Sequence, residues 1–230
     1  MFFLYPLVTI NYIYMAAAII PAILLLKYIY DIDQFDKEPP ALLAKLFVFG
    51  MISVIPAILL ERVAQMIIGQ GSSHMYYMID AFLGVALIEE GVKLFALKHG
   101  SFHERSFDYM FDGIVYAVFV SLGFAVVENI MYVYSGGVST AVVRALTSVP
   151  GHMCFAIPMG FFYSKAKRKA NRGESYGLQL FLAWFVPMIF HGIYDYVLMV
   201  NDTLSFILVL AVVYIILFSL AKQEKKDEPI

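Results

Sequence analysis

Long apolar stretches alternate with short polar separators along the chain. Seven windows of about 20 residues are apolar enough to cross a bilayer as helices, over residues 7–29, 41–60, 76–97, 113–134, 140–163, 177–200 and 203–221. The separators carry turn signals: residues 31–40 hold four acids, one lysine and a Pro-Pro pair, 69–73 are rich in Gly and Ser, and 135–137 read Ser-Gly-Gly. The pattern predicts an all-α, polytopic membrane bundle of about seven transmembrane helices.

Composition supports this class. Apolar residues make up 61% of the chain, charged residues only 15%, and the mean hydropathy is +0.78. With 230 residues and no long polar stretch, the chain has room for one transmembrane domain over 1–230 and for no added soluble domain. Its basic residues fall in short loops and form no continuous patch, so we expect the lipid bilayer as its surroundings and no nucleic-acid partner.

Lysine and arginine also predict the orientation. Five basic residues fall within 165–172 and three within 222–226, and these two segments are separated by two predicted spans. Because basic loops stay in the cytoplasm, both segments are expected on that side. Counting back through seven spans puts Lys98, Arg105, Lys27 and Lys37 on the same side, which predicts an N-out, C-in protein.

Four of the predicted spans carry ionisable residues where lipid favours apolar ones. They are Glu89, Glu90 and Lys93 in the third span, Glu128 in the fourth, His152 in the fifth, and His191 with Asp195 in the sixth. A charge at the centre of a bilayer costs about 2.5 to 3.5 kcal/mol on insertion scales. Several such residues on separate helices therefore predict one shared polar site inside the bundle.

Spacing within the helices refines this prediction. Lys93 lies three and four residues after the two glutamates, within reach of an ion pair. Successive helical residues differ by about 100°, so only one glutamate can point squarely into a given site. His191 and Asp195 lie one turn apart, the spacing at which a carboxylate fixes the tautomer of an imidazole.

Structural explanations compete with catalytic ones for single residues. Glu128, followed by Asn129, lies near the outer end of its span and could extend to the interface. His191 and Asp195 could form a structural hydrogen-bonded pair. In the fifth span, which starts near Arg144, Pro150 is expected to disturb the helix just before His152. Structural roles become less convincing when the residues are taken together, because each of four helices would have to offset the cost of burying its own ionisable group.

Two hydrolytic chemistries fit these residues. In one, Glu89 or Glu90 is the general base on water, and His191, His152 or Asn129 donates to the developing oxyanion. In the other, a Zn²⁺ ion activates the water. Its ligands would come from a set of carboxylates and imidazoles: Glu89, Glu90, Glu128, His152, His191 and Asp195.

Charge is consistent with either chemistry. Four carboxylates against Lys93 and Arg144 leave a charge of −2, which one divalent cation or two protons would neutralise. The His-Glu-x-x-His motif of many zinc proteases is absent from the sequence. A proton- or ion-coupled transporter is the alternative function, since transporters also place such residues at mid-membrane. The charged spans do not recur in two matching halves, as the repeats of many transporters would.

The ordered motifs resemble a known family. Glu89-Glu90-x-x-Lys93, Phe124-x-x-x-Glu128 and His191-x-x-x-Asp195, each in its own span, together with the loop ending Glu38-Pro39-Pro40, are similar to the PrsW intramembrane proteases of bacteria. The resemblance covers nearly the whole chain. It extends distantly to the CAAX-processing membrane proteases, from which this chain departs by carrying Glu128 where they have a histidine.

The resemblance implies a multi-pass protease of the bacterial cell membrane. Its expected substrate is a single-span membrane protein such as an anti-sigma factor, cut first on the outer side in a stress response. The residues expected to carry catalysis are Glu89, Glu90, Glu128, His191 and Asp195, with Lys93, Asn129, Arg144 and His152 in support.

Overall fold

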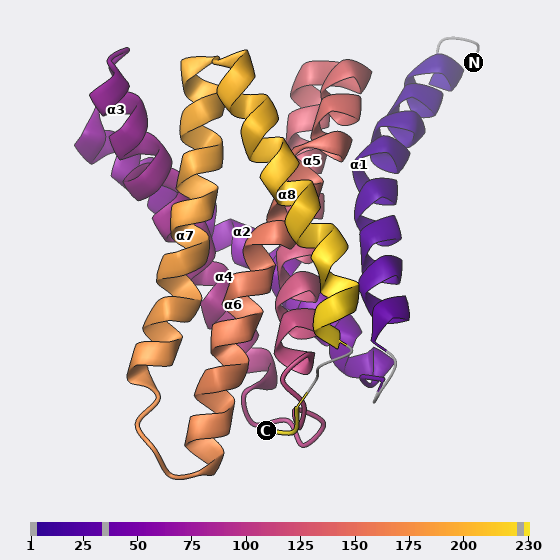
Figure 1. Ribbon diagram of the computed structural model, residues 1–230. Coiled ribbons are helices and arrows are strands. Elements are labelled where there is room, and N and C mark those ends of the chain that lie inside the picture. Colours follow the sequence, from indigo (N-terminus) through magenta and orange to yellow (C-terminus); the bar gives the residue numbers. More distant parts are fainter. Residues whose placement is uncertain (1–3, 34–36, 225–227) are drawn as a thin grey trace.

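The apolar stretches form helices in the computed structural model, which describes residues 4–33, 37–224 and 228–230 (Figure 1). In chain order they are α1 (Leu4–Ile32), α2 (Pro40–Ile68), α3 (His74–Ile79), the π-helix η1 (Asp80–Ala86), α4 (Leu87–Ser101), α5 (Asp112–Leu146), α6 (Ser148–Asn171), α7 (Gly177–Val200) and α8 (Thr203–Glu224). Residues 34–36 of the predicted loop and 225–227 of the charged tail lie outside the described residues. The predicted all-α membrane bundle is confirmed.

Length and apolar composition mark most of these helices as membrane-spanning. Within the described residues, four helical stretches meet both criteria: Tyr12–Ile32, Pro40–Ile68, Gly177–Val200 and Asp112–Asn171, which holds both α5 and α6. Thr203–Ser219 is apolar but shorter. The remaining stretch, α3 to α4, carries the charged residues of the predicted third span. Each predicted span thus has a helical counterpart.

Helix α5 lies at the centre and packs against α1, α2 and α6. Glycines allow these helices to approach closely, as is common in membranes. A Cβ atom on Gly123 would lie 2.1 Å from the carbonyl oxygen of Phe47 on α2, and one on Gly160 of α6 would lie 2.4 Å from that of Gly113. These contacts hold α2 and α6 closely against the first half of α5.

Two backbone irregularities shape the outer part of α5 and the start of α6. Gly137 has φ 76° and ψ −167°, a conformation suited to glycine, and it bends the chain within the predicted turn 135–137. The helix is interrupted at Thr147, so that α6 begins at Ser148. Pro150 therefore lies in the first turn of α6, where a proline is tolerated, and the break precedes it. His152 follows in the next turn.

The π-helix η1 leads directly into α4. The sequence predicted one continuous helix over 76–97, and the structure divides it because the backbone widens to i→i+5 hydrogen bonds over seven residues. Side chains from neighbouring helices tie this segment down. Gln65 of α2 donates to Asp80, and Trp184 of α7 donates through Nε1 to the carbonyl of Leu87 at 3.0 Å. The start of α4 is therefore held between α2 and α7.

One end of the bundle collects the basic segments. The end of α1, the α4–α5 and α6–α7 connections and the C-terminus all lie at the bottom of Figure 1, as the predicted orientation requires.

At this end of the bundle Tyr116 donates to the buried Glu38 in the loop before α2. Burial raises the pKa of Glu38 to about 7 even though this hydrogen bond favours its ionised form. The C-terminal residues pair with the loop before α5, where Ile230 N donates to Asp108 O at 2.7 Å.

Candidate active site

A buried lysine joins the two glutamates at the start of α4. Lys93 Nζ lies 2.9 Å from Glu89 Oε2 and 2.8 Å from Glu90 Oε1, and its side chain is fully buried. Its third neighbour is His152 Nδ1 at 3.2 Å. An ammonium group has three hydrogens to donate, and three acceptors surround this one. The predicted ion pair therefore forms, and it extends to a second helix.

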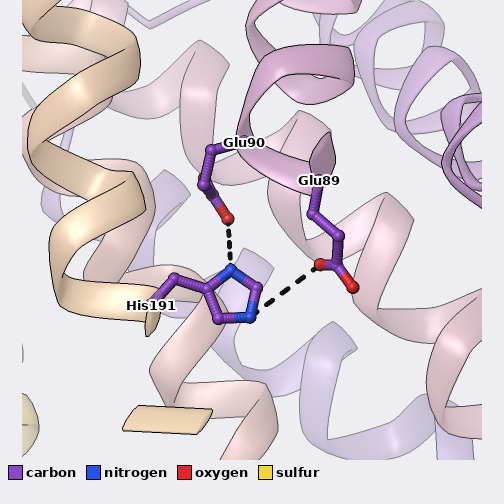
Figure 2. A group of neighbouring side chains, drawn as sticks. All are labelled: Glu89, Glu90 and His191. Atoms are coloured by element: carbon purple, nitrogen blue, oxygen red, sulfur yellow. Dashed lines mark hydrogen bonds and ion pairs between the residues drawn. The ribbon is translucent and has the colours of Figure 1, made fainter. Parts of the chain in front are cut away.

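His191 approaches the same glutamates from α7 (Figure 2). Its Nδ1 donates to Glu90 Oε1 at 2.8 Å, and its Nε2 lies 4.0 Å from Glu89 Oε2. Asp195 Oδ2 lies 3.3 Å from the same Nε2, at the i,i+4 spacing seen in the sequence. The ring of Phe155 stacks on the imidazole with 4.8 Å between centroids. Carboxylates and an aromatic ring thus fix the position of His191.

His152 links Lys93 to Glu128. Because Lys93 can only donate, Nδ1 of His152 must accept, and its Nε2 carries the proton that is donated to Glu128 Oε2 at 2.8 Å. Ser121 of α5 donates to the backbone carbonyl of His152 at 2.9 Å. The neighbours therefore select one neutral tautomer of this imidazole.

Arg144 completes the network beyond Glu128. Its guanidinium lies 2.9 Å from Glu128 Oε2, and its Nε donates to Asn129 Oδ1 at 2.9 Å. The amide of Asn129 donates in turn to the carbonyl of Ala18 on α1. All nine residues predicted for the site therefore belong to one continuous chain of contacts that runs from Asp195 to Asn129.

A cavity of about 580 Å³ opens beside this network. Glu89, Glu128, His152, His191 and Asp195 line it, whereas the fully buried Glu90 does not. Its walls also include residues near the outer end of α5 and the C-terminal end of α7, among them Ser135 and Met199. The cavity thus extends toward the end of the bundle opposite the basic connections. Of the two adjacent glutamates, Glu89 is the one that borders the open space.

Sequence reasoning missed Glu61 and Tyr132, which also line the cavity. The predicted second span ended at residue 60, which placed Glu61 in a loop, but α2 continues to Ile68. The helical spacing of the residues before Glu61 could have revealed that it belongs to the same helix face. Glu61 follows Val54, Ala57 and Ile58 at steps of three and four residues, and all four residues line the cavity.

The residues suit a zinc ion in their chemistry. One ligand atom each from Glu89, Glu90 and His191 lies within 4.8 Å of the others. Glu90 Oε2 is buried and has no hydrogen-bond partner among the described residues, which leaves a carboxylate oxygen able to bind a cation. Mixed imidazole and carboxylate donors are typical of catalytic zinc. Lys93 offsets one of the two carboxylate charges, so with a neutral His191, as a zinc ligand must be, this group keeps a net negative charge.

Buried acids and imidazoles around a cavity inside a membrane bundle are the groups that a membrane-embedded hydrolase requires. Residues 38–221 of the chain match the sequence model of the PrsW family of intramembrane metalloproteases. The chain belongs to this family. It is therefore a multi-pass bacterial membrane protein and a protease.

Several curated relatives share this assignment, each named Protease PrsW. The chain is 36% identical to that of Geobacillus kaustophilus over 189 residues, which cover 81% of this chain and 80% of the relative. It is 36% identical to that of Bacillus subtilis, covering 91% and 94%. For Clostridioides difficile the identity is 35%, covering 90% and 89%. No solved structure matches the chain. The transporter alternative receives no support from these findings.

Proposed function

We propose that the chain cuts a peptide bond of a single-span membrane protein on the outer side of the membrane, with an anti-sigma factor as the substrate. The observation that carries the outer-side cut is the cavity, which borders Glu89 and His191 and extends away from the basic end of the bundle. The anti-sigma factor rests on the resemblance to the PrsW family. A bond near the outer end of a substrate span could reach these side chains without crossing the bilayer.

Within this proposal Glu89 acts on the attacking water. Glu89 borders the cavity, and Lys93 donates a hydrogen bond to one of its oxygens, which fixes the position of the carboxylate. Glu90 has a positioning role, because it is fully buried and holds both Lys93 and His191. The bound water would lose its proton to Glu89 as it attacks the carbonyl carbon, and the same carboxyl would return a proton to the leaving amine.

The imidazoles and Arg144 supply donors at the cavity wall. In the metal-free reaction both ring nitrogens of His191 carry protons: Nδ1 donates to Glu90, and Nε2, beside Asp195 at the cavity wall, is the donor proposed for the developing oxyanion. His152 and Arg144 hold Glu128 from two sides. We assign Asn129 a positioning role, since its oxygen accepts from Arg144 and its amide donates to α1.

A metal fits the same place. Glu89, Glu90 and His191 would hold a zinc ion, which when bound lowers the pKa of its water and polarises the carbonyl. His191 would then be neutral and turn one ring nitrogen to the ion in place of its carboxylate partner, the carboxylate at the other nitrogen would orient the ring, and Lys93 would still limit the negative charge.

The test is cleavage by purified protein in proteoliposomes, with a single-span protein carrying tags at both ends. We expect one cut, mapped by mass spectrometry of the products to the outer part of the span or just beyond it. Cleavage confined to the cytoplasmic side, or none with a panel of single-span substrates, would contradict the proposal.

Chelation addresses the metal. If zinc is held by the Glu-Glu-His group, a membrane-permeant chelator should lower the rate at least tenfold, and added Zn²⁺ should restore it. Zinc bound per protein, measured by elemental analysis, should fall in Glu90→Gln and stay unchanged in Glu174→Gln, an exposed residue paired with Lys169. An unchanged rate after complete removal of metal would show that the glutamates act without it.

A further inference from the structure

A second cavity lies near the cytoplasmic end, bounded by α5, α6, α7 and α8. It measures about 540 Å³ and shares no lining residue with the active-site cavity. Its walls are mainly apolar, with Ile157 and Phe161 on α6, Phe190 on α7 and Ile216 on α8. Phe161 and Phe190 are 39% and 38% exposed, so these walls are open to the surroundings of the bundle. We refer to this cavity as the α6 groove.

The length of the α6 groove matches one leaflet of a bilayer. It extends along α6 from Ile157 to Arg168, a separation of 11 residues. At 1.5 Å per residue this is about 16 Å, close to half of a hydrocarbon core of about 30 Å. A groove of this length, with its basic end toward the cytoplasmic side, suits an acyl chain of one leaflet.

Cations stand at its cytoplasmic end. Lys165 and Arg168 line the groove one helical turn apart. Arg168 pairs with Glu228 at 3.1 Å. Lys165 lies 4.3 Å above the ring of Phe161 and has no acidic partner in the part of the chain that the structure describes. Glu228, the partner of Arg168, also lines the groove, but no ion pair joins it to Lys165, whose ammonium group is held at the rim of the groove.

The neighbouring lysines are engaged elsewhere. Lys167 donates to the carbonyl of Phe102 at 2.8 Å, and Lys169 pairs with Glu174 at 3.4 Å. Neither lines the groove. Of the three lysines in this basic segment, Lys165 is therefore the one that lines the groove.

We infer that the α6 groove binds an anionic glycerophospholipid of the cytoplasmic leaflet, with an acyl chain along its apolar walls and the phosphate at Lys165 and Arg168. Basic pockets between helices on this side of a membrane suit anionic headgroups. An apolar helix in the same place would leave Lys165 unpaired beside hydrocarbon. Lys165, Arg168 and Glu228 give the lining a net positive charge, and a zwitterionic lipid would add a further cation to it.

The test counts bound lipid by native mass spectrometry. The protein is reconstituted with equal amounts of phosphatidylglycerol and phosphatidylcholine of the same chain length and then extracted in mild detergent. We expect retained phosphatidylglycerol to exceed phosphatidylcholine about fivefold or more, and Lys165→Gln to abolish this preference. Lys169→Gln is the matched control and should keep it. Ile216→Trp, which fills the groove, should lower retention of both lipids.

The readout is independent of proteolysis. A wild-type protein without preference, or an equal loss in Lys165→Gln and Lys169→Gln, would overturn the inference. Thermal unfolding of each variant separates loss of the site from loss of the fold. Should Lys165→Gln fail to fold, Ile216→Trp carries the test, and unchanged retention of phosphatidylglycerol in that variant would overturn the inference.

Discussion

At the scale of single residues, hydrogen-bond matching explains how so many ionisable groups are buried together. The three N–H groups of Lys93 face three acceptor atoms on neighbouring residues. His152 accepts at one ring nitrogen and donates at the other, and each nitrogen has a partner. Removing one partner of such a pair leaves an uncompensated charge in a medium of low dielectric. The network should therefore be sensitive to the loss of any member, whether or not that member touches substrate.

Lys93→Met tests this directly. The substitution keeps the length of the side chain but leaves Glu89 and Glu90 facing each other without a cation. We expect the free energy of unfolding to fall by about 3 to 5 kcal/mol, measured by denaturant titration in detergent. Lys45→Met removes a partly exposed pair with Glu104 and should cost less than about 1 kcal/mol. Equal costs for the two variants would contradict the buried pairing.

Asp195 has a positioning role in the proposed mechanism. Asp195→Asn keeps the shape but weakens the hold on His191 Nε2. We expect the maximal cleavage rate to fall about 10- to 100-fold with little change in KM, as for the loss of other residues that orient a catalytic histidine. Asp31→Asn, at an exposed pair with Lys27, is the control. A full rate with Asp195→Asn would remove this role.

Glu38 should make stability depend on pH. Its pKa of about 7 lies above the ordinary value of 4.5, so between these values the folded state binds more protons than the unfolded one. Stability from this group is therefore present at pH 5 and is lost as the pH rises through about 7. The thermal midpoint of wild type should fall relative to that of Glu38→Gln between pH 5 and 8. Parallel pH profiles would show that Glu38 is not the cause.

At the scale of elements, close crossings at glycine position the helices that carry the site. Helix α5 brings Glu128 to the cavity, and its contact with α2 at Gly123 and Phe47 positions the helix that brings Glu61 there. The π-helix has a related effect, since it sets the rotation of α4 and so the direction of Glu89. Packing between helices thus determines which polar residues meet.

Gly123→Ala should disturb the α2–α5 crossing. The new Cβ would lie 2.1 Å from Phe47 O, so the helices must separate, at a cost of about 1 to 3 kcal/mol. Gly177→Ala, at the start of α7 with open space around it, should leave the thermal midpoint unchanged. A Gly123→Ala protein as stable as wild type would show that the helices are not closely packed there.

The elements differ in how far their sequence predicts them. Residues 177–200 were predicted and observed with the same bounds, because a long apolar stretch between polar loops has few alternatives in a membrane. The division of 76–97 into α3, η1 and α4 was not predicted. A change from α- to π-helix shifts hydrogen bonds by one residue and leaves no mark in composition, so it depends on contacts such as Trp184 with Leu87.

At the scale of the whole molecule, local pairs in the site were predictable and long-range ones were not. His191 with Asp195, and Glu89 with Lys93, follow from a spacing of four residues on one helix. The contact between Glu90 and His191 joins residues 101 positions apart and requires the packing of α4 on α7. The sequence predicted convergence of the charged spans from the cost of burial, but not which atoms would meet.

The molecule has two functional ends in this account. The cavity with Glu89 and His191 extends to one end, and the α6 groove with Lys165 lies toward the other. The central claim concerns the first: acids and imidazoles from α4, α5, α6 and α7 form one site that hydrolyses a peptide bond inside the membrane.

The most direct measurement is the rate at which purified variants cleave one single-span substrate in proteoliposomes. Glu89→Gln and His191→Ala should each lose at least 99% of the wild-type rate, while Glu174→Gln, folded to the same degree, should retain it. Cleavage at the wild-type rate by a folded Glu89→Gln or His191→Ala protein would contradict the account.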